Sequence, residues 1–316
     1  MMPVHILALL CGALLDLIVG DPEWFPHPVR LMGRWIAFAE KAAKRGNPSP
    51  KTLRRRAVAV ALSTVALSAG AAWGILYLLG LWGRWPRFVG MALMSWTCLS
   101  ARNLFDEAEG VRRALDRSLE EGRARVARIV GRDTAKLTRH EVLCAAIETV
   151  AENTTDGVIS PMIYLALGGP ALGMAFKAVS TLDSMIGYLD EAHRDVGWFS
   201  ARLDDAFNYV PARIAALFMC LAAFPLGMDG RRALSTVRRD HDKHLSPNCA
   251  WTEAAAAGAL GVRLGGDHEY AGQTVHKPTI GKSCRLPEGR DIRRTCLLMF
   301  AAAGMALAVI ALAAVI

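Results

Sequence analysis

The chain has 316 residues, of which 53% are hydrophobic, and its mean hydropathy is +0.26. This value is high for a water-soluble enzyme, so the composition argues against an ordinary pair of soluble domains. The net charge is +8, but no arginine-rich helix with interleaved aromatic residues supports nucleic-acid binding. The composition therefore favours a membrane protein that has no nucleic-acid partner.

Four apolar runs approach the length of about 20 residues that a spanning helix needs. They cover residues 2–20, 57–82, 88–104 and 296–316. The first run lacks the basic start and the cleavage site of a signal peptide, so we expect it to remain as a helix. Because Ala, Leu, Arg and Glu dominate while strand-like alternation is scarce, we expect an all-α integral membrane protein with at least these four transmembrane helices.

Two further apolar segments, 157–176 and 210–226, allow two interpretations. Pro161 and the run Gly168-Gly169-Pro170 interrupt the first segment. Either both segments cross the membrane, which leaves 177–209 outside, or both are broken or re-entrant, which leaves it inside. Irregular backbone is tolerated at membrane depth where it lines a cavity. We favour the inside placement, because a site that used ATP would have to face the cytoplasm.

Basic residues gather in segments 21–56, 102–156 and 227–294. The positive-inside rule places these segments in the cytoplasm and both chain ends outside. We therefore expect a single membrane-embedded helical domain over 1–316. It would be a multi-pass protein of the inner membrane with these three segments as cytoplasmic loops and its active site on the cytoplasmic side.

The second basic segment contains two predicted helices. Residues 103–131 have the pattern of an amphipathic helix. The run from Thr138 to Glu141 fits a capping box, in which each side chain satisfies a backbone N–H group of the other residue. A helix should therefore start near Thr138 and stop at about Glu152, before the polar turn 153–157.

Acidic and amide side chains gather at the predicted end of this helix. Glu148, Glu152 and Asp156 are spaced i, i+4, i+8, and Asn153 adds an amide. The spacing places the two glutamates on one helix face. A carboxylate beside hydrocarbon is costly, so the cluster is a candidate site for a metal or a substrate amine. The alternative is a solvated helix face followed by a polar turn.

A second acidic pattern, DDxxN, is formed by Asp204, Asp205 and Asn208. Asp204 and Asn208 are one helical turn apart, so they can share a cation, and acidic motifs can hold diphosphate through Mg²⁺. The alternative is a capped or salt-bridged helix face. Asp183 is either a further ligand or an acid that the helix dipole favours near a helix start.

The segment from Asp21 to Arg30 contains three prolines in ten residues, so regular helix is excluded for it as a whole. A rigid loop that presents Asp21, His27 and Arg30 at the membrane surface suits anion or substrate binding. The alternative is an interfacial turn anchored by Trp24 and Phe25.

Several longer blocks carry a resemblance to one family. They read DLIVGDPEWFPHPVRLMGRWI, ETVAENTTDGVISPMIYLALGG, STLDSMIGY, ARLDDAFNYVPAR, and HLSPN followed by LGVRLGG. In this order they cover nearly the whole chain and resemble the CobD/CbiB family of cobalamin biosynthesis, the adenosylcobinamide-phosphate synthases. The family often reads NTLDSM where this chain has Ser180 in the first place, so a hydroxyl replaces an amide there.

The resemblance implies an ATP-dependent ligase. It would join a propionate of adenosylcobyric acid to (R)-1-amino-2-propanol or its O-phosphate, and Mg²⁺ is expected with ATP. The implied partners are this corrinoid, the aminopropanol and membrane lipid, while the need for another protein of the cobalamin pathway stays open.

The chemistry of such a ligase guides the assignment of roles. The acid must be activated, as an acyl phosphate, with positive charge near the developing anion. We assign the catalytic role to Glu148, Glu152, Asn153 and Asp156. We assign substrate binding to Asp21, His27, Arg30, Arg202, Arg213 and Asn248. We assign metal binding to Asp183, Asp204, Asp205 and Asn208.

Two other functions fit parts of the sequence. The breaks at Pro161 and Gly168-Gly169-Pro170 are typical of a transporter or a membrane sensor. The DDxxN pattern is compatible with a Mg²⁺-dependent membrane transferase that acts on a diphosphate.

Overall fold

The computed structural model describes residues 2–22, 24–131, 133–188, 193–266, 268–270, 273–275, 278–282 and 284–316. The chain forms two compact units. The first comprises Met1–Ser100, Ser160–Asn208 and Val309–Ile316, and the second comprises Ala101–Ile159 and Tyr209–Ala308. Each unit is described by itself. The expectation of a single membrane-embedded domain stays a prediction.

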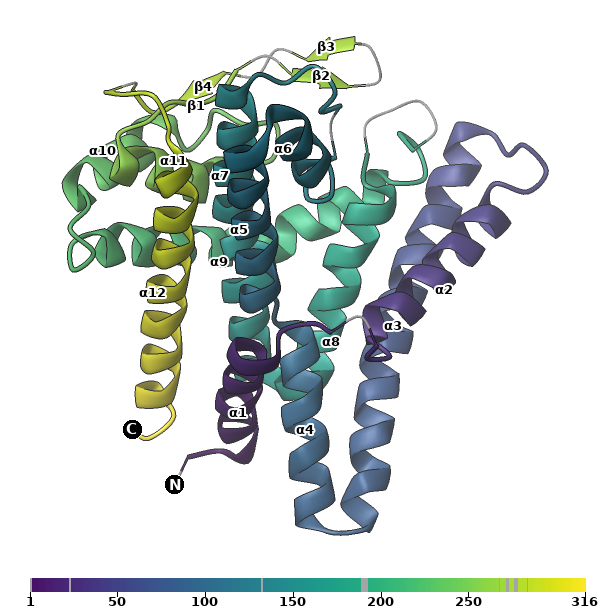
Figure 1. Cartoon of the computed structure of the whole chain (residues 1–316). Coiled ribbons are helices and arrows are strands. Elements are labelled where there is room, and N and C mark those ends of the chain that lie inside the picture. The colour runs from purple at the N-terminus through teal and green to yellow at the C-terminus, as the bar shows by residue number, and fades with distance from the viewer. Residues whose placement is uncertain are drawn as a thin grey trace. The chain divides into compact units, whose positions relative to one another are not determined.

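The first unit is a helical bundle. Its helices are α1 (Val4–Val19), α2 (Pro28–Ala43), α3 (Pro50–Leu81), α4 (Arg84–Cys98), α8 (Ser160–Ile186) and residues 198–208 of α9 (Trp198–Ala223). Helices α3 and α4 form an antiparallel hairpin (Figure 1), and α8 packs against both. Helix α1 packs closely on α4, and Gly12 makes this possible because a Cβ atom there would lie 2.8 Å from the backbone nitrogen of Trp96.

The second unit is also mainly helical. It contains α5 (Ala101–Arg117), α6 (Leu119–Val126), α7 (Arg139–Asn153), the π-helix η1 (Thr154–Ile159), residues 209–223 of α9, α10 (Gly230–Asp240), α11 (Cys249–Leu260) and residues 289–308 of α12 (Gly289–Ala313). Among the residues that the structure describes, four short strands form two antiparallel pairs: β1 (Leu264–Gly265) with β4 (Thr279–Ile280), and β2 (His268–Tyr270) with β3 (Gln273–Val275). Helix α11 packs on α7 and α10, which gives this unit an alanine-rich core.

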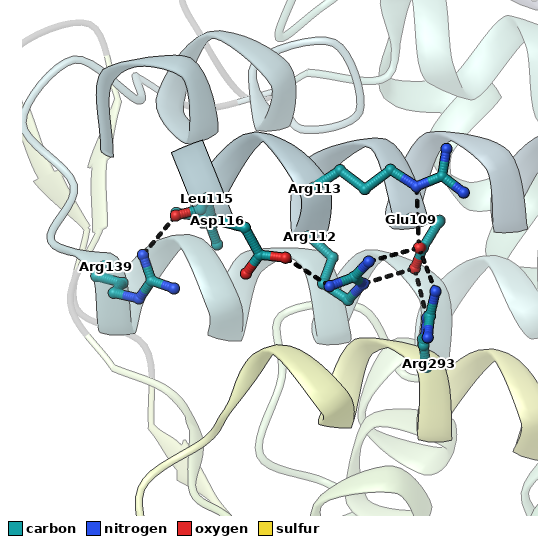
Figure 2. Close-up of polar contacts among 7 residues, drawn as sticks. All are labelled: Glu109, Arg112, Arg113, Leu115, Asp116, Arg139 and Arg293. Carbon is teal, nitrogen blue, oxygen red and sulfur yellow. Dashed lines mark hydrogen bonds and ion pairs between the residues drawn. The ribbon is translucent and has the colours of Figure 1, made fainter. Parts of the chain in front are cut away.

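An ion network joins α5 to α12 within the second unit (Figure 2). Glu109 is 3% exposed, and its two carboxylate oxygens accept hydrogen bonds from Arg112, Arg113 and Arg293. Arg112 also donates to Asp116 at 2.6 Å. Hydrogen bonds from the arginines hold the pKa of the Glu109 carboxyl far below its usual 4.5. The carboxylate is therefore ionised under all ordinary conditions.

The length and apolarity of the helices confirm an all-α membrane protein. Within the described residues, four helical runs are long and apolar enough to cross a membrane. Three of them are the single helices α3, α9 and α12, and the fourth is the run Arg139–Ile186, which consists of α7, η1 and α8. The uncharged runs 57–82 and 296–316 lie largely within α3 and α12. Helix α1 is apolar but has only 16 residues.

The structure corrects the bounds of the other apolar segments. Helix α4 ends at Cys98 and Leu99 is extended, so the run 88–104 is divided between α4 and α5. The run 157–176 is helical, and its backbone leaves helical geometry at Gly168 and Gly169 as the glycines predicted. The run 210–226 belongs largely to the continuous helix α9. Both helices are long enough to cross, while the side on which 177–209 lies stays a prediction.

The amphipathic segment 103–131 is also divided. Ser118 leaves helical geometry and its hydroxyl accepts from the backbone N–H of Glu121, so one helix ends and α6 begins there. The amphipathic pattern predicts a core-facing side for Leu104, Val111, Leu115 and Leu119; the first three are buried, and Leu119, which lies beyond the division, is half-buried.

Candidate functional site

The chain between α7 and α8 does not form the polar turn that the sequence predicted. Thr138 and Glu141 form the expected capping box at the start of α7. At the other end, however, helix continues through Asn153 into the π-helix η1 and then α8. Pro161 has no N–H group to donate to the carbonyl four residues earlier, so a regular α-helix cannot continue unchanged through this point. Asp156 therefore lies inside a π-helical turn, a geometry that is frequent at functional sites.

Short polar side chains satisfy backbone groups in this turn. The Asn153 amide donates to the Thr149 carbonyl at 2.9 Å, and the Thr154 hydroxyl donates to the Val150 carbonyl at 2.8 Å. Asn153, assigned to catalysis from the sequence, thus holds its own helix with its NH₂ group. Its amide oxygen is the atom that remains to be considered for a substrate.

A thiol and three carboxylates meet where α11 packs on α7. The Cys249 thiol donates to Glu152 Oε1 at 3.0 Å. Glu253, one turn further along α11, is 5% exposed. Burial raises the pKa of the Cys249 thiol well above its usual value, and the charges of Glu152, Glu253 and Asp156 raise this pKa further. The thiol therefore stays protonated, which suits a hydrogen-bond donor to Glu152 rather than a nucleophile.

Glu148 has a different partner. Its Oε1 accepts from the backbone N–H of Gly265 in β1 at 2.8 Å. Glu148 and Glu152 thus use one face of α7, as the i, i+4 spacing predicted, but they contact different elements. Glu148 anchors a strand, and Glu152 lies beside the thiol of α11.

Arg213 lies between two aromatic rings in the second unit. Its guanidinium carbon is 3.5 Å from the ring centre of Tyr209 and 4.6 Å from that of Trp251. It donates to the Tyr209 carbonyl and, at 3.4 Å, to Asn248 Oδ1. The His241 ring in turn packs on Trp251 with 4.5 Å between centroids. These contacts fix the plane of the guanidinium, which is what bidentate recognition of a phosphate requires.

The loop before α2 forms a buried polar pair in the first unit. His27 Nε2 lies 3.7 Å from Asp21 Oδ1, and both atoms are buried without a hydrogen-bond partner among the described residues. Burial, and after it the charges of Lys177 and Arg30, lower the pKa of His27 to about 4. Burial also raises the pKa of Asp21, which the charge of Lys177 opposes. The pair is therefore a neutral imidazole that faces a carboxyl group.

The loop before α2 ends earlier than the prolines predicted. His27 is the N-cap of α2, and its Nδ1 accepts from the Val29 N–H at 3.3 Å. Arg30 therefore lies in the first turn of α2 rather than in the loop, as a correction to the predicted segment.

The DDxxN pattern forms the one-turn contact that its spacing predicted. The Asn208 amide NH₂ donates to Asp204 Oδ2 at 3.0 Å. The Ser160 hydroxyl donates to Asn208 Oδ1 at 2.6 Å, and Asn208 is fully buried. The amide oxygen assigned to a metal thus already accepts a hydrogen bond, and Asn208 serves to hold the Asp204 carboxylate.

The described residues contain no group of three or more His, Cys, Asp or Glu side chains arranged to hold a metal ion. Mg²⁺ in nucleotide sites is commonly bound by one or two carboxylates together with substrate phosphates. The assignment of Asp183, Asp204 and Asp205 to a metal stays a prediction, and it is of a site that the substrate phosphates would complete.

The predicted site residues fall into both units. The first unit contains Asp21, His27, Arg30, Asp183, Arg202, Asp204, Asp205 and Asn208. The second contains Glu148, Glu152, Asn153, Asp156, Arg213 and Asn248. The structure joins Asp21 to His27, Asp204 to Asn208, and Arg213 to Asn248, whereas Arg30 and Arg202 lie exposed on α2 and α9.

Sequence reasoning missed four residues that complete these clusters. They are Lys177, Cys249, Trp251 and Glu253. A signal existed for two of them. Lys177 is the only basic residue of α8, and Glu253 is the only charged residue of α11.

Comparison with known proteins places the chain in a family. The family model described as CobD/Cbib protein matches residues 9–299. A cobalamin biosynthesis protein CobD from Klebsiella pneumoniae subsp. pneumoniae is 46% identical over 296 residues, which is 93% of each chain. A cobalamin biosynthesis protein CbiB from Salmonella typhi is 45% identical over 304 residues, which is 96% of this chain and 95% of the relative. No solved structure matches.

The family model and these relatives agree over nearly the whole length of the chain, which includes the motifs that carried the resemblance. The chain therefore belongs to the CobD/CbiB family of cobalamin biosynthesis proteins.

Proposed function

We propose that this chain is an ATP-dependent acid–amine ligase that forms adenosylcobinamide or its phosphate. Its substrates are adenosylcobyric acid, ATP and (R)-1-amino-2-propanol or its O-phosphate. The observation that supports this best is the acidic cluster around Glu152, in which a protonated thiol orients one carboxylate at 3.0 Å. An amine substrate is an ammonium ion near pH 7, so a cluster of negative charge attracts it and a carboxylate beside it can take its proton.

The proposed reaction has two steps. A propionate oxygen of the corrinoid attacks the γ-phosphorus of ATP, the bond from this phosphorus to ADP breaks, and an acyl phosphate forms. The amine nitrogen then attacks the acyl carbon, the carbon–oxygen bond to phosphate breaks, and a proton leaves the nitrogen. The balance is one acid, one amine and one ATP converted to one amide, one ADP and one phosphate.

In the second unit we assign the proton acceptor to Glu152. Asp156 and Glu253 add negative charge, and both act on the same thiol. Glu148 holds β1 through Gly265. With Glu148 engaged in this way, Glu152 is the better candidate for general base.

Arg213 is our candidate for the phosphate of the phosphorylated amine. Its plane is held by Tyr209 and Trp251, and within the part of the chain that the structure describes its side chain faces an amide oxygen, that of Asn248, rather than a carboxylate. An arginine without a bound carboxylate keeps its charge available for an anion.

In the first unit we assign the nucleotide-associated Mg²⁺ to Asp204 and Asp205, with Asp183 as a further candidate. The ion would supply charge neutralisation on the ATP phosphates. Asn208 orients Asp204 through a 3.0 Å hydrogen bond. The neutral His27 and the Asp21 carboxyl, with their unpartnered buried atoms, offer a donor and an acceptor to a polar group of a substrate.

The test is an assay of the full chain purified in detergent. The protein is incubated with adenosylcobyric acid, ATP and Mg²⁺ and with either form of the aminopropanol. Mass spectrometry measures the corrinoid amide, and a coupled assay measures ADP. The proposal expects equal amounts of amide and ADP. No amide with either amine, also after addition of cell extract to supply a partner, would refute the ligase.

Two matched variants separate the function from the site. Glu152→Gln keeps the shape of the side chain but cannot take a proton, so we expect amide formation to fall by about 100- to 10,000-fold. Glu121→Gln makes the same chemical change in an exposed ion pair with Arg117 and should leave the rate unchanged. Equal rates in both variants would keep the ligase and remove Glu152 from its site.

A further inference from the structure

A cavity of about 450 Å³ lies inside the first unit, at the end of the α3–α4 hairpin. It is bounded by the last turns of α3, the first turns of α4, the start of α1 and the break in α8. The residues that matter to the argument are His5, Trp73, Tyr77, Arg87, Gly168 and Gly169. None of the residues assigned above to catalysis or to substrate lines it.

Aromatic side chains place this cavity at a membrane–water interface. The Trp73 and Tyr77 rings stack with 5.6 Å between centroids, and both are more than half exposed. Trp82 at the end of α3 and Trp85 in the first turn of α4 are 83% and 65% exposed. Exposed Trp and Tyr side chains of spanning helices gather at the level of lipid head groups. The opposite end of α3 carries the basic residues Lys51, Arg54, Arg55 and Arg56.

The break in α8 gives the cavity a backbone wall. Gly168 and Gly169 leave helical geometry, and Gly169 has φ +62°. The His5 ring donates from Nε2 to the Ala166 carbonyl at 3.0 Å, which satisfies a carbonyl that the break leaves without a helical partner. Leu172 fills the space beside Gly168, whereas a Cβ atom at Gly169 would meet only the His5 Cβ, at 3.6 Å, so the room for a ligand group lies beside Gly169.

The charge of the lining has one sign. Arg87 contributes a guanidinium, and no Asp or Glu is among the residues that line the cavity. The apolar lining continues onto the outer face of α3, where Ile75, Leu78 and Leu81 are 48–66% exposed. A ligand that matches this surface has an anionic head at the interface and a hydrocarbon part along the helix.

We infer that this cavity binds one anionic phospholipid, with its phosphate on Arg87 and its acyl chains along α3. The volume lies within the range of ligand sites and fits a head group with the first part of its chains. A guanidinium at interfacial depth is the group that binds a lipid phosphate through charge-assisted hydrogen bonds. The bound lipid fills the break in α8 and ties it to the α3–α4 hairpin.

The test uses the full chain in detergent after removal of native lipid. Thermal unfolding is measured with increasing phosphatidylglycerol, with phosphatidylcholine of the same acyl chains, and with glycerol 1-phosphate. The inference expects a rise of the melting temperature with phosphatidylglycerol only. An equal rise with phosphatidylcholine would show that the head-group charge is not read. An equal rise with glycerol 1-phosphate would assign the site to a soluble phosphate.

Two arginines of the same helix provide the matched variants. Arg87→Gln should weaken the phosphatidylglycerol effect by about tenfold or more in concentration, since charge-assisted bonds are lost. Arg84→Gln should leave it unchanged, because Arg84 lies over the Trp85 ring at 5.6 Å and does not line the cavity. Arg87→Lys, which restores the charge, guards against a folding defect. Identical titrations for Arg87→Gln and Arg84→Gln would overturn the inference.

Discussion

Glu109→Gln is the sharpest test of how the second unit is held together. The Glu109 carboxylate is 3% exposed and joins α5 to α12 through Arg293, at 2.6 and 2.9 Å (Figure 2). The same carboxylate receives two hydrogen bonds of 2.8 Å from Arg112. The substitution keeps the size of the side chain, removes its charge and leaves three guanidinium groups facing one another.

The size of the effect follows from the exposure of the partners. Loss of one partner of a buried ion pair lowers stability by about 3–5 kcal/mol. The Arg113 and Arg293 side chains are 68% and 55% exposed, so water screens them after the change, whereas Arg112 is 20% exposed. We therefore expect Glu109→Gln to lower the free energy of unfolding of the second unit by about 3 kcal/mol, the lower end of that range.

A denaturant titration in detergent micelles measures this change. Cys144 and Cys296 are buried free thiols of the second unit, so their modification, measured at these two residues by peptide mass spectrometry, reports its unfolding; the exposed Cys11 and Cys284 are first replaced by serine. Glu121→Gln is the control, because the Arg117–Glu121 pair is 65% and 49% exposed and should contribute less than about 1 kcal/mol. Equal losses in the two variants would refute the reasoning.

The dependence on pH provides a second measurement on the same residue. The pKa of Glu109 is lowered by folding, so its contribution is complete above the usual value of 4.5 and is lost as pH falls below that value. The difference in stability between the wild-type chain and Glu109→Gln should therefore be constant above about pH 5 and should shrink as the pH is lowered below 4.5. A constant difference would contradict the assigned cause.

Three further predictions concern other elements. Because folding lowers the pKa of His27 from 6.5 to about 4, the unfolded chain binds the proton first; stability should fall as pH decreases from 6.5 toward 4, and His27→Gln should remove that slope in unfolding titrations. Thr138→Ala removes the capping box with Glu141 and should lower stability by about 1 kcal/mol without loss of amide formation. Ser160→Ala leaves the buried Asn208 oxygen without its donor and should lower stability by about 1–3 kcal/mol, while Ser160→Thr, which keeps the hydroxyl, should lose less.

The elements that sequence reasoning predicted well are those that local chemistry determines. An uncharged run such as 57–82 requires helix in a bilayer, because only helix satisfies its backbone groups within the segment. The capping box at Thr138 depends on residues three apart, and the break at Gly168 and Gly169 depends on the residues themselves. The bounds of α4 were missed, because nothing in the apolar composition around Leu99 marks the extended residue that separates two helices.

The turn predicted at residues 153–157 fails for a physical reason. Asn, Thr, Asp and Gly favour turns because their side chains compete for backbone hydrogen bonds. Here the side chains of Asn153 and Thr154 bond back to carbonyls of α7 and so extend the helix instead of ending it. Local propensity was correct about where the backbone departs from regular α-helix, but it gave the wrong kind of departure.

Sequence reasoning predicted some residues of the candidate site but not their partners, because the contacts join residues that are distant in sequence. Glu152 and Cys249 are 97 residues apart, and Arg213 and Asn248 are 35 apart. A motif can point to Glu152 or Arg213, but only the packing of α11 on α7 shows that a thiol donates a hydrogen bond to Glu152. The visible clue was Glu253, a lone charge in an alanine-rich run, because an isolated carboxylate in a buried helix requires partners from elsewhere in the fold. The Glu253 side chain is only 5% exposed and its charge acts on Cys249, so the acidic cluster is a buried site and not a solvated helix face.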